Sequence, residues 1–244
     1  MSPGSPPRLS IVVPAYNEEQ RLPRTLRELA RWVAANQPRT EVIVVENGST
    51  DSTARVVRDF CREHPFVQLI ADVPRGKGVA VRRGMLHATG DLRFLCDADL
   101  SMPIDELGKF LAAARDGADL AIGSREAPGA ARLGEPRLRH VMGRVFNRLV
   151  QALAVRGFQD TQCGFKLFTA AAARDLFSRA RMTGWGFDPE VLFLAQRRGY
   201  RIDEVPIVWH SDSDSRVRPV HDALAMVGDL LAIRWNQLRG RYGD

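Results

Sequence analysis

The sequence predicts an α/β fold, with a mostly parallel sheet and flanking helices on both faces. Two observations lead to this prediction. In the first half of the chain, short apolar runs of strand length alternate with longer segments whose apolar residues recur at helical spacing. Strands that alternate with helices in this way form parallel sheets that the helices cover. A chain of 244 residues with 45% apolar residues is long enough to bury one large core in such a fold.

Five strands are expected in the first half, each a short and mostly apolar run: 9–13, 41–45, 67–71, 92–96 and 119–123. The first helix begins near Pro23, which suits an early helical position. Cap-type residues at 49–53 start the second helix, glycines at 76–78 open the third, and residues 104–115 form the fourth.

The second half has a different pattern. It starts with a loop rich in Gly, Pro and Arg over residues 125–139, and a helix follows. The remaining elements are expected as a loop and strand over 160–168, a helix over 188–198, a strand over 201–209 and a helix over 222–238. No linker separates the halves, so we expect one domain over 9–244, preceded by a flexible Ser- and Pro-rich tail at 1–8.

The net charge of +6 comes almost wholly from arginine. Arginine suits phosphate binding, because its planar fork donates two parallel hydrogen bonds. An excess of positive charge suits a nucleic acid, an anionic membrane or a phosphorylated substrate, and charge alone does not choose among them. Acidic residues at the expected strand ends argue against a non-catalytic basic module, and we expect no nucleic-acid partner.

Three cysteines, Cys61, Cys96 and Cys163, are widely spaced and odd in number. This pattern argues against a disulfide framework or a zinc site and favours thiols in a reducing compartment. No segment has the ~18–20 uninterrupted apolar residues that a membrane span requires. We therefore expect a cytoplasmic protein, with peripheral contact at the cytoplasmic face of a membrane as an alternative.

The sharpest chemical signal is Asp97-Ala98-Asp99, at the end of the strand expected over 92–96. Two carboxylates beside a buried strand are costly unless a positive charge neutralises them. Mg²⁺ or Mn²⁺ prefers oxygen ligands and keeps positions open for substrate phosphates. Asp97 and Asp99 are therefore candidate metal ligands, although the same spacing is common on protein surfaces.

Two other expected strands end in similar polar loops. After the first comes Pro14-Ala15-Tyr16-Asn17-Glu18, in which Tyr16 can stack on a base and Glu18 can bond a nucleoside. After the second comes a loop in which Glu46 and Asp51 can accept from a base imide or from ribose hydroxyls. At the first of these loops, a plain strand-to-helix turn is the alternative.

Lys77 lies between two glycines at the start of the third expected helix. Glycine allows close backbone approach and a helix N-terminus favours anions, so Lys77 is a candidate phosphate contact. The spacing of a Walker A loop is absent, which argues against ordinary nucleotide hydrolysis. Because residues 124–125 also follow an expected strand, all these loops are expected to face one cleft.

Together these motifs resemble glycosyltransferase family 2, with its GT-A fold. In the first half the resemblance rests on residues 13–18, 46–51 and 97–99. In the second half, three further motifs resemble the dolichyl-phosphate β-glucosyltransferase branch, with the dolichyl-phosphate mannose synthases as near neighbours: 160–168, 185–190 and 204–209. The resemblance covers nearly the whole chain.

The resemblance implies an inverting transferase that moves a hexose, with glucose favoured, from a nucleotide sugar, with UDP-glucose favoured, to a polyprenyl or dolichyl phosphate. Residues 9–124 would then bind the nucleotide sugar and the metal, and residues 125–244 the acceptor. Glu46 and Asn47 depart from the family, which usually has aspartates there. The nucleotide-sugar candidates are Pro14, Ala15, Tyr16, Glu18, Glu46, Asp51, Lys77, Asp97 and Ala98.

The catalytic candidates are Asp97, Asp99 and Asp188. Asp188 would act as a base or bond a sugar hydroxyl, and a helix N-cap is the alternative, because Pro189 follows it. For any single arginine the alternative is a solvated surface charge, whereas the set favours acceptor binding. The acceptor-binding candidates are Arg125, Arg132, Arg137, Arg139, Arg144, Gln162, Trp185, Arg216 and Arg218.

The last expected helix carries Leu224, Val227, Leu231 and Trp235 on one stripe. Core packing is the expected role of this stripe, and contact with a membrane surface is the alternative. Three rival functions stay open: a family 2 transferase that uses GDP-mannose or a soluble acceptor, a nucleotidyltransferase, and a binding module. The sequence leaves the oligomeric state open.

Overall fold

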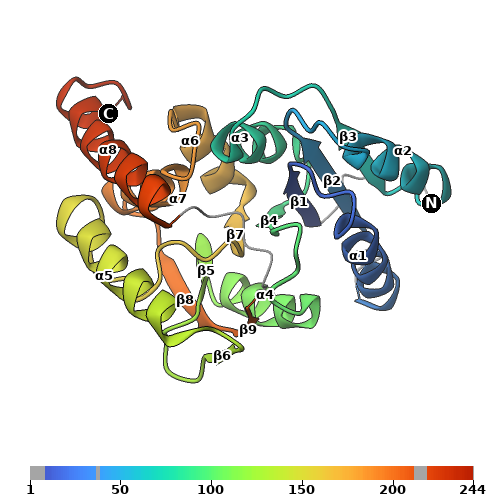
Figure 1. The fold of residues 1–244 in the computed structure, drawn as a ribbon, viewed down its shortest axis with the longest axis horizontal. Helices are drawn as coiled ribbons and strands as arrows, with labels where there is room; N and C mark the ends of the chain where they lie inside the picture. Colours follow the sequence, from blue (N-terminus) through green and yellow to red (C-terminus); the bar gives the residue numbers. More distant parts are fainter. Residues whose placement is uncertain (1–8, 37–38, 212–218, 244) are drawn as a thin grey trace.

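The computed structural model describes residues 9–36, 39–211 and 219–243, which form one large sheet flanked by helices (Figure 1). Seven strands form the large sheet in the order β3-β2-β1-β4-β7-β5-β8, and a small sheet pairs β6 with β9. The predicted α/β fold, with a mostly parallel sheet and helices on both faces, is confirmed. The strands are β1 (Leu9–Ala15), β2 (Thr40–Glu46), β3 (Val67–Ile70), β4 (Leu92–Leu95), β5 (Leu120–Ser124), β6 (Ala131–Leu133), β7 (Lys166–Thr169), β8 (Ile202–Pro206) and β9 (Val208–His210).

Helices cover both faces of the large sheet. Val13 and Phe94 point into an apolar cluster under α1, α2 and α4, whereas Val12 and Leu95 point into a second cluster under α3, α6 and α7. Neighbouring residues of a strand face opposite sides, so each strand supplies both clusters. The helices are α1 (Leu22–Asn36), α2 (Thr53–Glu63), α3 (Lys77–His87), the 3₁₀ turn η1 (Ile104–Glu106), α4 (Leu107–Arg115), α5 (Arg137–Leu153), α6 (Ala170–Arg179), α7 (Phe187–Arg197) and α8 (Pro219–Leu238).

The strand directions bring five chain segments to one edge of the sheet. β1, β2 and β4 run parallel, and β5 runs parallel to β8. β7 lies between β4 and β5 and is antiparallel to both. The carboxyl ends of β1, β2, β4 and β5 therefore share an edge with the start of β7. The chain folds so that the four predicted strand-end loops meet there, as parallel α/β sheets require.

Two expectations for the second half were wrong. The predicted single strand over 201–209 is two strands, because Pro206 ends β8 and β9 pairs instead with β6. The predicted loop over 125–139 contains β6, a three-residue strand whose partner β9 lies far along the chain. Proline has no amide hydrogen, so a strand is readily interrupted at such a residue.

Helix α6 was not predicted from the sequence.

The last helix turns a different face to the core than expected. Met226, Leu230 and Ile233 are buried, whereas Leu231 is 57% and Trp235 is 53% exposed. The core-packing interpretation is therefore wrong for Leu231 and Trp235. The sequence of α8 is apolar around much of its circumference, so two stripes fitted helical spacing, and tertiary packing selected the other one. The side chain of Leu224 lies outside the described residues.

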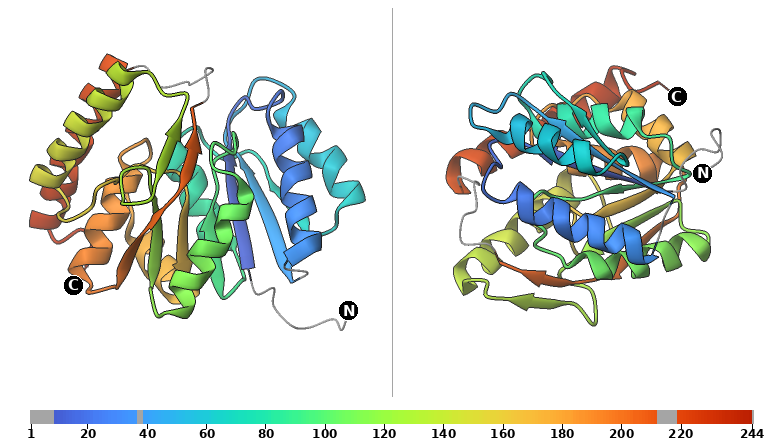
Figure 2. Two further views of the ribbon diagram at one scale, coloured as in Figure 1. Left: turned by 90° about the horizontal axis from the view of Figure 1, so that it is seen from below. Right: turned by 90° about the vertical axis from the view of Figure 1, so that its right-hand side faces the viewer.

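Helices α5 and α8 lie side by side at one end of the molecule, and α1 and α2 lie at the other (Figures 1 and 2). The guanidinium Nε of Arg234 on α8 donates to the carbonyl of Leu153, the last residue of α5. Phe146, Leu149 and Leu153 of α5 pack against the second apolar cluster. No helix in the described part of the chain has the length and hydropathy of a membrane span.

Candidate active site

The loops after β1 and β2 are tied together by hydrogen bonds between side chains and backbone. The amides of Asn17 and Glu18 donate to Ser49 Oγ and Thr53 Oγ1, at 3.0 and 2.7 Å. The cap-type residues predicted at 49–53 therefore support the β1 loop, and the residue before α2, Ser52, makes no side-chain cap bond. We call the two bonded segments, 14–19 and 46–53, the double loop.

Tyr16 and Glu18 lie in the β1 part of the double loop. The guanidinium of Arg75 lies 4.7 Å from the centre of the Tyr16 ring, a cation–π contact. Both carboxylate oxygens of Glu18 accept hydrogen bonds from Arg21, each at 2.7 Å. Glu18 thus takes part in the strand-to-helix turn that was the alternative interpretation, while Tyr16 brings an aromatic ring to the edge of the sheet.

Glu46 and Asp51 lie in the β2 part of the double loop. Glu46 is 5% exposed, stands opposite Ala15 in the sheet, and accepts a hydrogen bond from the amide of Ser49. One carboxylate oxygen of Asp51 accepts from the amide and hydroxyl of Thr53, at 2.9 and 2.5 Å. Pro14 and Ala15 end β1 beside them. The candidate nucleoside residues therefore form one compact group.

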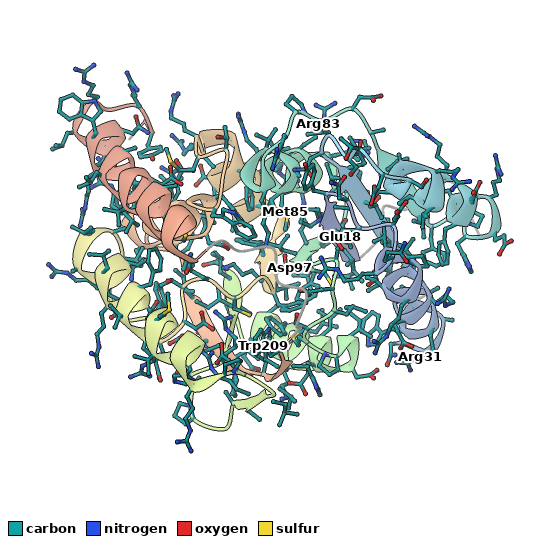
Figure 3. The ribbon with its side chains drawn as sticks, viewed as in Figure 1. Glu18, Arg31, Arg83, Met85, Asp97 and Trp209 are labelled. Carbon is teal, nitrogen blue, oxygen red and sulfur yellow. The ribbon has the colours of Figure 1, made fainter. Side chains whose placement is uncertain are left out.

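Asp97 and Asp99 follow β4, and Asp97 lies near the centre of the molecule between Glu18 and Trp209 (Figure 3). Ala98 is 6% exposed, and its carbonyl accepts from the Thr25 hydroxyl of α1 at 2.6 Å. Burial, followed by the negative charge of Asp97, raises the pKa of Asp99. The protein alone therefore leaves the charge of Asp99 incompletely neutralised.

Lys77, the first residue of α3, bonds to Asp97 with 2.7 Å between Nζ and Oδ1. Burial alone would lower the pKa of Lys77, but the charges of Asp97, Asp188 and Asp99 outweigh it, and the pKa is raised. Its Nζ also lies 4.8 Å from the ring centre of Trp185. A compact ammonium group is thus held among carboxylates at the start of a helix, where anions are favoured.

Asp188 is the second residue of α7, and Gly186 is the N-cap, so the N-cap interpretation of Asp188 is wrong. Asp188 Oδ1 lies 2.5 Å from Nζ of Lys166, and the two side chains are 3% and 1% exposed. Lys166 is the first residue of β7, which starts at this edge because it runs antiparallel. The sheet direction therefore supplies the buried partner of Asp188.

Gly164 lets the segment before β7 close onto Asp97. A Cβ atom at Gly164 would lie 1.7 Å from Oδ2 of Asp97, so any side chain there would displace the carboxylate. Charges of both signs lie next to one another at this edge of the sheet: Asp99, Asp97, Lys77, Asp188 and Lys166. The chain has only three lysines, and two of them lie in this group.

The segment 181–186, which carries Trp185, is braced from both sides. The amide of Gly78 donates to the carbonyl of Thr183 at 2.9 Å, and a Cβ at Gly78 would lie 2.3 Å from the carbonyl oxygen of Met182. The carboxylate of Glu190 accepts from the amide of Met182 at 2.8 Å and from the hydroxyl of Tyr242 at 2.7 Å. The end of the chain is therefore connected to the start of α3.

The predicted acceptor arginines lie around one loop, and most of those described already pair with carboxylates. Arg125 bonds both oxygens of Asp160, at 2.6 and 2.9 Å. Burial alone would raise the pKa of Asp160, but the Arg125 guanidinium lowers it to about 2. Arg132 and Arg144 both pair with Glu126. These arginines form a connected basic group whose counter-ions are internal.

The other acceptor candidates are spread more widely. Arg137 is exposed at the start of α5, and Trp185 is 38% exposed. Gln162 Nε2 lies 3.7 Å from the sulfur of Met226, which connects the segment before β7 with α8. Arg216, Arg218 and the side chain of Arg139 lie outside the described residues.

Sequence reasoning missed Lys166, Asp160 and Arg75. A signal existed for Lys166, because a lone charge in the apolar run 165–168 must find a buried partner. Asp160 belongs to one of the family motifs, but its pairing with Arg125 depends on the fold. Arg75 stands in a glycine-rich turn, and its contact with Tyr16 joins loops far apart in the sequence.

The donor set at this edge suits a divalent cation that takes further ligands from a substrate. Among the described residues, no group of three or more His, Cys, Asp or Glu side chains is placed to hold a metal ion. Asp97 and Asp99 carry carboxylate oxygens, which such a cation prefers, and burial raises the pKa of Asp99, so a nearby cation would stabilise its charged form. Two carboxylates plus phosphate oxygens and water is the usual arrangement for Mg²⁺ at phosphate sites.

The chain belongs to glycosyl transferase family 2, whose family model matches residues 10–177. Among its relatives is a dolichyl-phosphate beta-glucosyltransferase of Trichomonas vaginalis, 39% identical over 237 residues that cover 92% of this chain and 70% of the relative. The dolichyl-phosphate beta-glucosyltransferases of Homo sapiens and Saccharomyces cerevisiae are 36% and 34% identical, and each alignment covers 77% of the relative. The predicted family resemblance is confirmed.

The same fold occurs in glucosyl-3-phosphoglycerate synthase from Mycobacterium tuberculosis. Its complex with phosphoglyceric acid matches with a TM-score of 0.68 at 20% sequence identity, covering 96% of this chain and 80% of that one. Another structure of the same enzyme, which contains Mn²⁺ and UDP-glucose, has a TM-score of 0.67. At this level of identity the comparison establishes the shared fold.

Proposed function

We propose that this chain transfers glucose from UDP-glucose to a polyprenyl phosphate such as dolichyl phosphate, with inversion at the anomeric carbon. The observation that carries this proposal is the pair Asp97 and Asp99 at the end of β4, with Lys77 and Asp188 beside it. We call the edge of the sheet where these residues meet the catalytic edge. Relatives named for glucosyl transfer to dolichyl phosphate, at up to 39% identity, support the choice of sugar and acceptor.

The double loop would hold the nucleoside. Tyr16 offers a ring for stacking, and Glu46 and Asp51 offer carboxylate oxygens to the base and ribose. Because hydrogen bonds already fix both loops, binding would require little reordering of the backbone. Pro14, Ala15 and Ala98 would shape the walls of this pocket.

Asp97 and Asp99 would hold Mg²⁺ or Mn²⁺, which stabilises negative charge on the leaving diphosphate. Lys77 lies on Asp97 at the start of α3 and is placed to bond the diphosphate as well. The presence of Mn²⁺ and UDP-glucose in a structure of the same fold supports the use of a divalent cation. Trp185, beside Lys77, would cover the sugar and exclude water.

The reaction itself needs little acid–base help from the protein. A phosphate monoester has a second pKa near ~6, so the lipid phosphate is mostly a dianion at neutral pH and attacks without a general base. Its oxygen forms a bond to the anomeric carbon as the bond from that carbon to the diphosphate breaks. Lys166 anchors one oxygen of Asp188, which would orient a sugar hydroxyl with the other.

The acceptor phosphate would bind in the second half of the chain. Arg125, Arg132 and Arg144 surround the loop after β5, and Glu126 neutralises two of them. A dianionic phosphate would replace the Glu126 contacts with stronger bidentate ones. We place the reaction in the cytoplasm, because the buried thiols of Cys96 and Cys163 suit a reducing compartment.

A donor screen tests the proposal. The melting temperature of the protein would be measured with UDP-glucose, GDP-mannose, UDP-N-acetylglucosamine and ATP, with and without Mn²⁺, since a ligand of the folded state raises it. We expect an Mn²⁺-dependent rise with UDP-glucose, followed by glucosyl transfer to an isoprenyl phosphate. A rise with GDP-mannose alone would contradict the sugar assignment, and no rise with any donor would contradict the enzyme assignment.

A further inference from the structure

Large apolar side chains are exposed mainly at one end of the molecule. Nine such side chains are exposed among the described residues, and six of them lie on α5 and α8. We call these six the outer face: Val141, Met142 and Val145 on α5, and Leu231, Trp235 and Leu238 on α8. Scattered apolar residues are ordinary on a protein surface, but a concentration on two adjacent helices indicates a binding surface.

Each helix presents the outer face as a stripe. Val141 and Val145 are one turn apart, and Leu231, Trp235 and Leu238 follow one another at intervals of four and three residues. The buried residues of α8 lie on its other side, at Met226, Leu230 and Ile233. Because α5 and α8 are neighbours in the outermost layer (Figure 2), both stripes belong to the same end of the protein.

The charge beside the outer face is positive. Helix α5 contains four arginines and no aspartate or glutamate. Directly after α8, the guanidinium of Arg239 lies 4.4 Å from the ring centre of Trp235, next to the stripe. Arg144 and Arg148 also line a cavity of about 290 Å³ between α5 and residues 157–159. Apolar side chains next to arginines and a tryptophan match the acyl and phosphate layers of an anionic bilayer surface.

A second copy of the chain would fit this surface poorly. In a symmetric dimer the same patch meets itself, so the arginines of one α5 would lie near those of the other. Like charges held together at an interface oppose association. A lipid surface supplies the opposite charge instead.

We propose that the outer face docks on the surface of an anionic phospholipid bilayer, with its apolar stripes among the acyl chains and with Arg148 and Arg239 on lipid phosphates. The proposal rests on the proposed function and extends it, because docking would bring the enzyme to the membrane that holds a lipid-linked acceptor. Docking involves only the outer face, so the binding of the protein to vesicles can be measured without a nucleotide sugar and without the transfer reaction.

Vesicle co-sedimentation tests the proposal with the full chain. We expect binding to vesicles of phosphatidylcholine with phosphatidylglycerol, weaker binding to phosphatidylcholine alone, and a decrease with added salt. The pairs Leu231→Gln/Trp235→Gln and Val141→Gln/Val145→Gln should each lower the partition constant by roughly tenfold or more. Leu86→Gln, which changes a residue 40% exposed on α3, is the matched control and should bind as the wild type does.

Charge is tested separately. Arg148→Gln should weaken binding to the anionic vesicles by roughly fivefold, since a basic residue near such a surface contributes about 1 kcal/mol. Its control is Arg62→Gln on α2, whose side chain is 79% exposed at the other end of the molecule. Unchanged melting temperatures would show that all variants fold.

Three results would overturn the proposal. The first two are paired variants that bind vesicles as tightly as the wild type, and equal binding of the wild type to both lipid compositions. The third is a wild-type dimer that Leu231→Gln/Trp235→Gln converts to a monomer in sedimentation velocity. The last result would assign the outer face to a second copy. Transfer to a short, water-soluble isoprenyl phosphate separates this proposal from the proposed function. Variants that dock poorly should keep that activity, and loss of that activity in the wild type would contradict the function alone.

Discussion

The double loop and the loop after β5 both lie at the catalytic edge, but they are held by different kinds of bond. In the double loop, backbone amides of Asn17 and Glu18 bond hydroxyls of the neighbouring loop. After β5, the guanidinium groups of Arg132 and Arg144 share one carboxylate, Glu126. Backbone bonds fix the path of the chain, whereas ion pairs between side chains exchange readily with other ions.

This difference suggests separate tasks for the two regions. A pocket whose backbone is fixed recognises one shape, which suits a nucleoside. A group of arginines with an internal counter-ion stays neutralised until a stronger anion arrives, which suits a phosphate acceptor. The donor side should therefore respond to mutation mainly through catalysis and folding, and the acceptor side mainly through acceptor affinity.

The largest effect is expected at Asp99. Asp99→Ala removes a proposed cation ligand and should lower kcat/KM by roughly a thousandfold, comparable to the loss of a main electrostatic contact to a transition state. Steady-state kinetics with UDP-glucose and an isoprenyl phosphate would measure it. Asp105→Ala, a change of an exposed carboxylate on η1, is the control. A folded Asp99→Ala protein with normal activity and Mn²⁺-dependent donor binding would show that the site lies elsewhere.

Lys166→Met should have the next largest effect, on stability. It leaves the buried Asp188 without its partner, and breaking a buried ion pair costs about 3 to 5 kcal/mol of unfolding free energy. Urea denaturation would measure the loss. Lys166→Met/Asp188→Leu should recover part of the stability but not the activity. A single variant as stable as the wild type would mean that Asp188 is not anchored by Lys166.

Asp160→Asn tests the buried pair on the acceptor side. The native pKa of Asp160 is lowered to about 2 from its ordinary 3.8, so the charged form stabilises the fold. This contribution, about 2 kcal/mol, is present above pH ~4 and is lost as the pH falls through ~2. Denaturation of both proteins over that range should show the stability difference at neutral pH and its disappearance in acid. A difference that persists at low pH would reflect packing instead.

The smallest effect is expected at Glu126. Glu126→Gln removes the shared counter-ion of Arg132 and Arg144, so the KM for the acceptor phosphate should fall by roughly threefold while the KM for the donor stays the same. Glu28→Gln, which removes one of the two exposed partners of Arg31, provides the control. An increase in acceptor KM would show that Glu126 positions the arginines instead of competing with the phosphate.

Much of the catalytic edge can be predicted from local sequence. Alternating strands and helices determine which loops meet, so the pattern alone predicts that Asp97, Asp99 and the double loop share one edge of the sheet. The glycines around Lys77 and the start of a helix there predict a phosphate contact, whereas its bond to Asp97 is known only from the fold. These inferences need only spacing along the chain and the rule for parallel sheets.

Other features depend on contacts between distant segments. β6 has three residues and forms because β9 lies beside it, so no local pattern marks it as a strand. The partner of Asp188 comes from β7, whose reversed direction the apolar pattern does not reveal. The exposed stripe of α8 is mispredicted because an apolar helix offers two faces, and only packing decides between them.

The hydrogen bond between Tyr242 and Glu190 links the last residues of the chain to the segment around Lys77, so the binding of a donor at Lys77 should be detectable near Tyr242. Glu190 also accepts a hydrogen bond from the amide of Met182, and the carbonyl of the next residue, Thr183, accepts one from the amide of Gly78. Three hydrogen bonds therefore connect Tyr242 with the start of α3. Segments linked in this way open together. A donor that settles on Lys77 should therefore slow amide hydrogen exchange in the final turn of the protein, far from any atom that it touches.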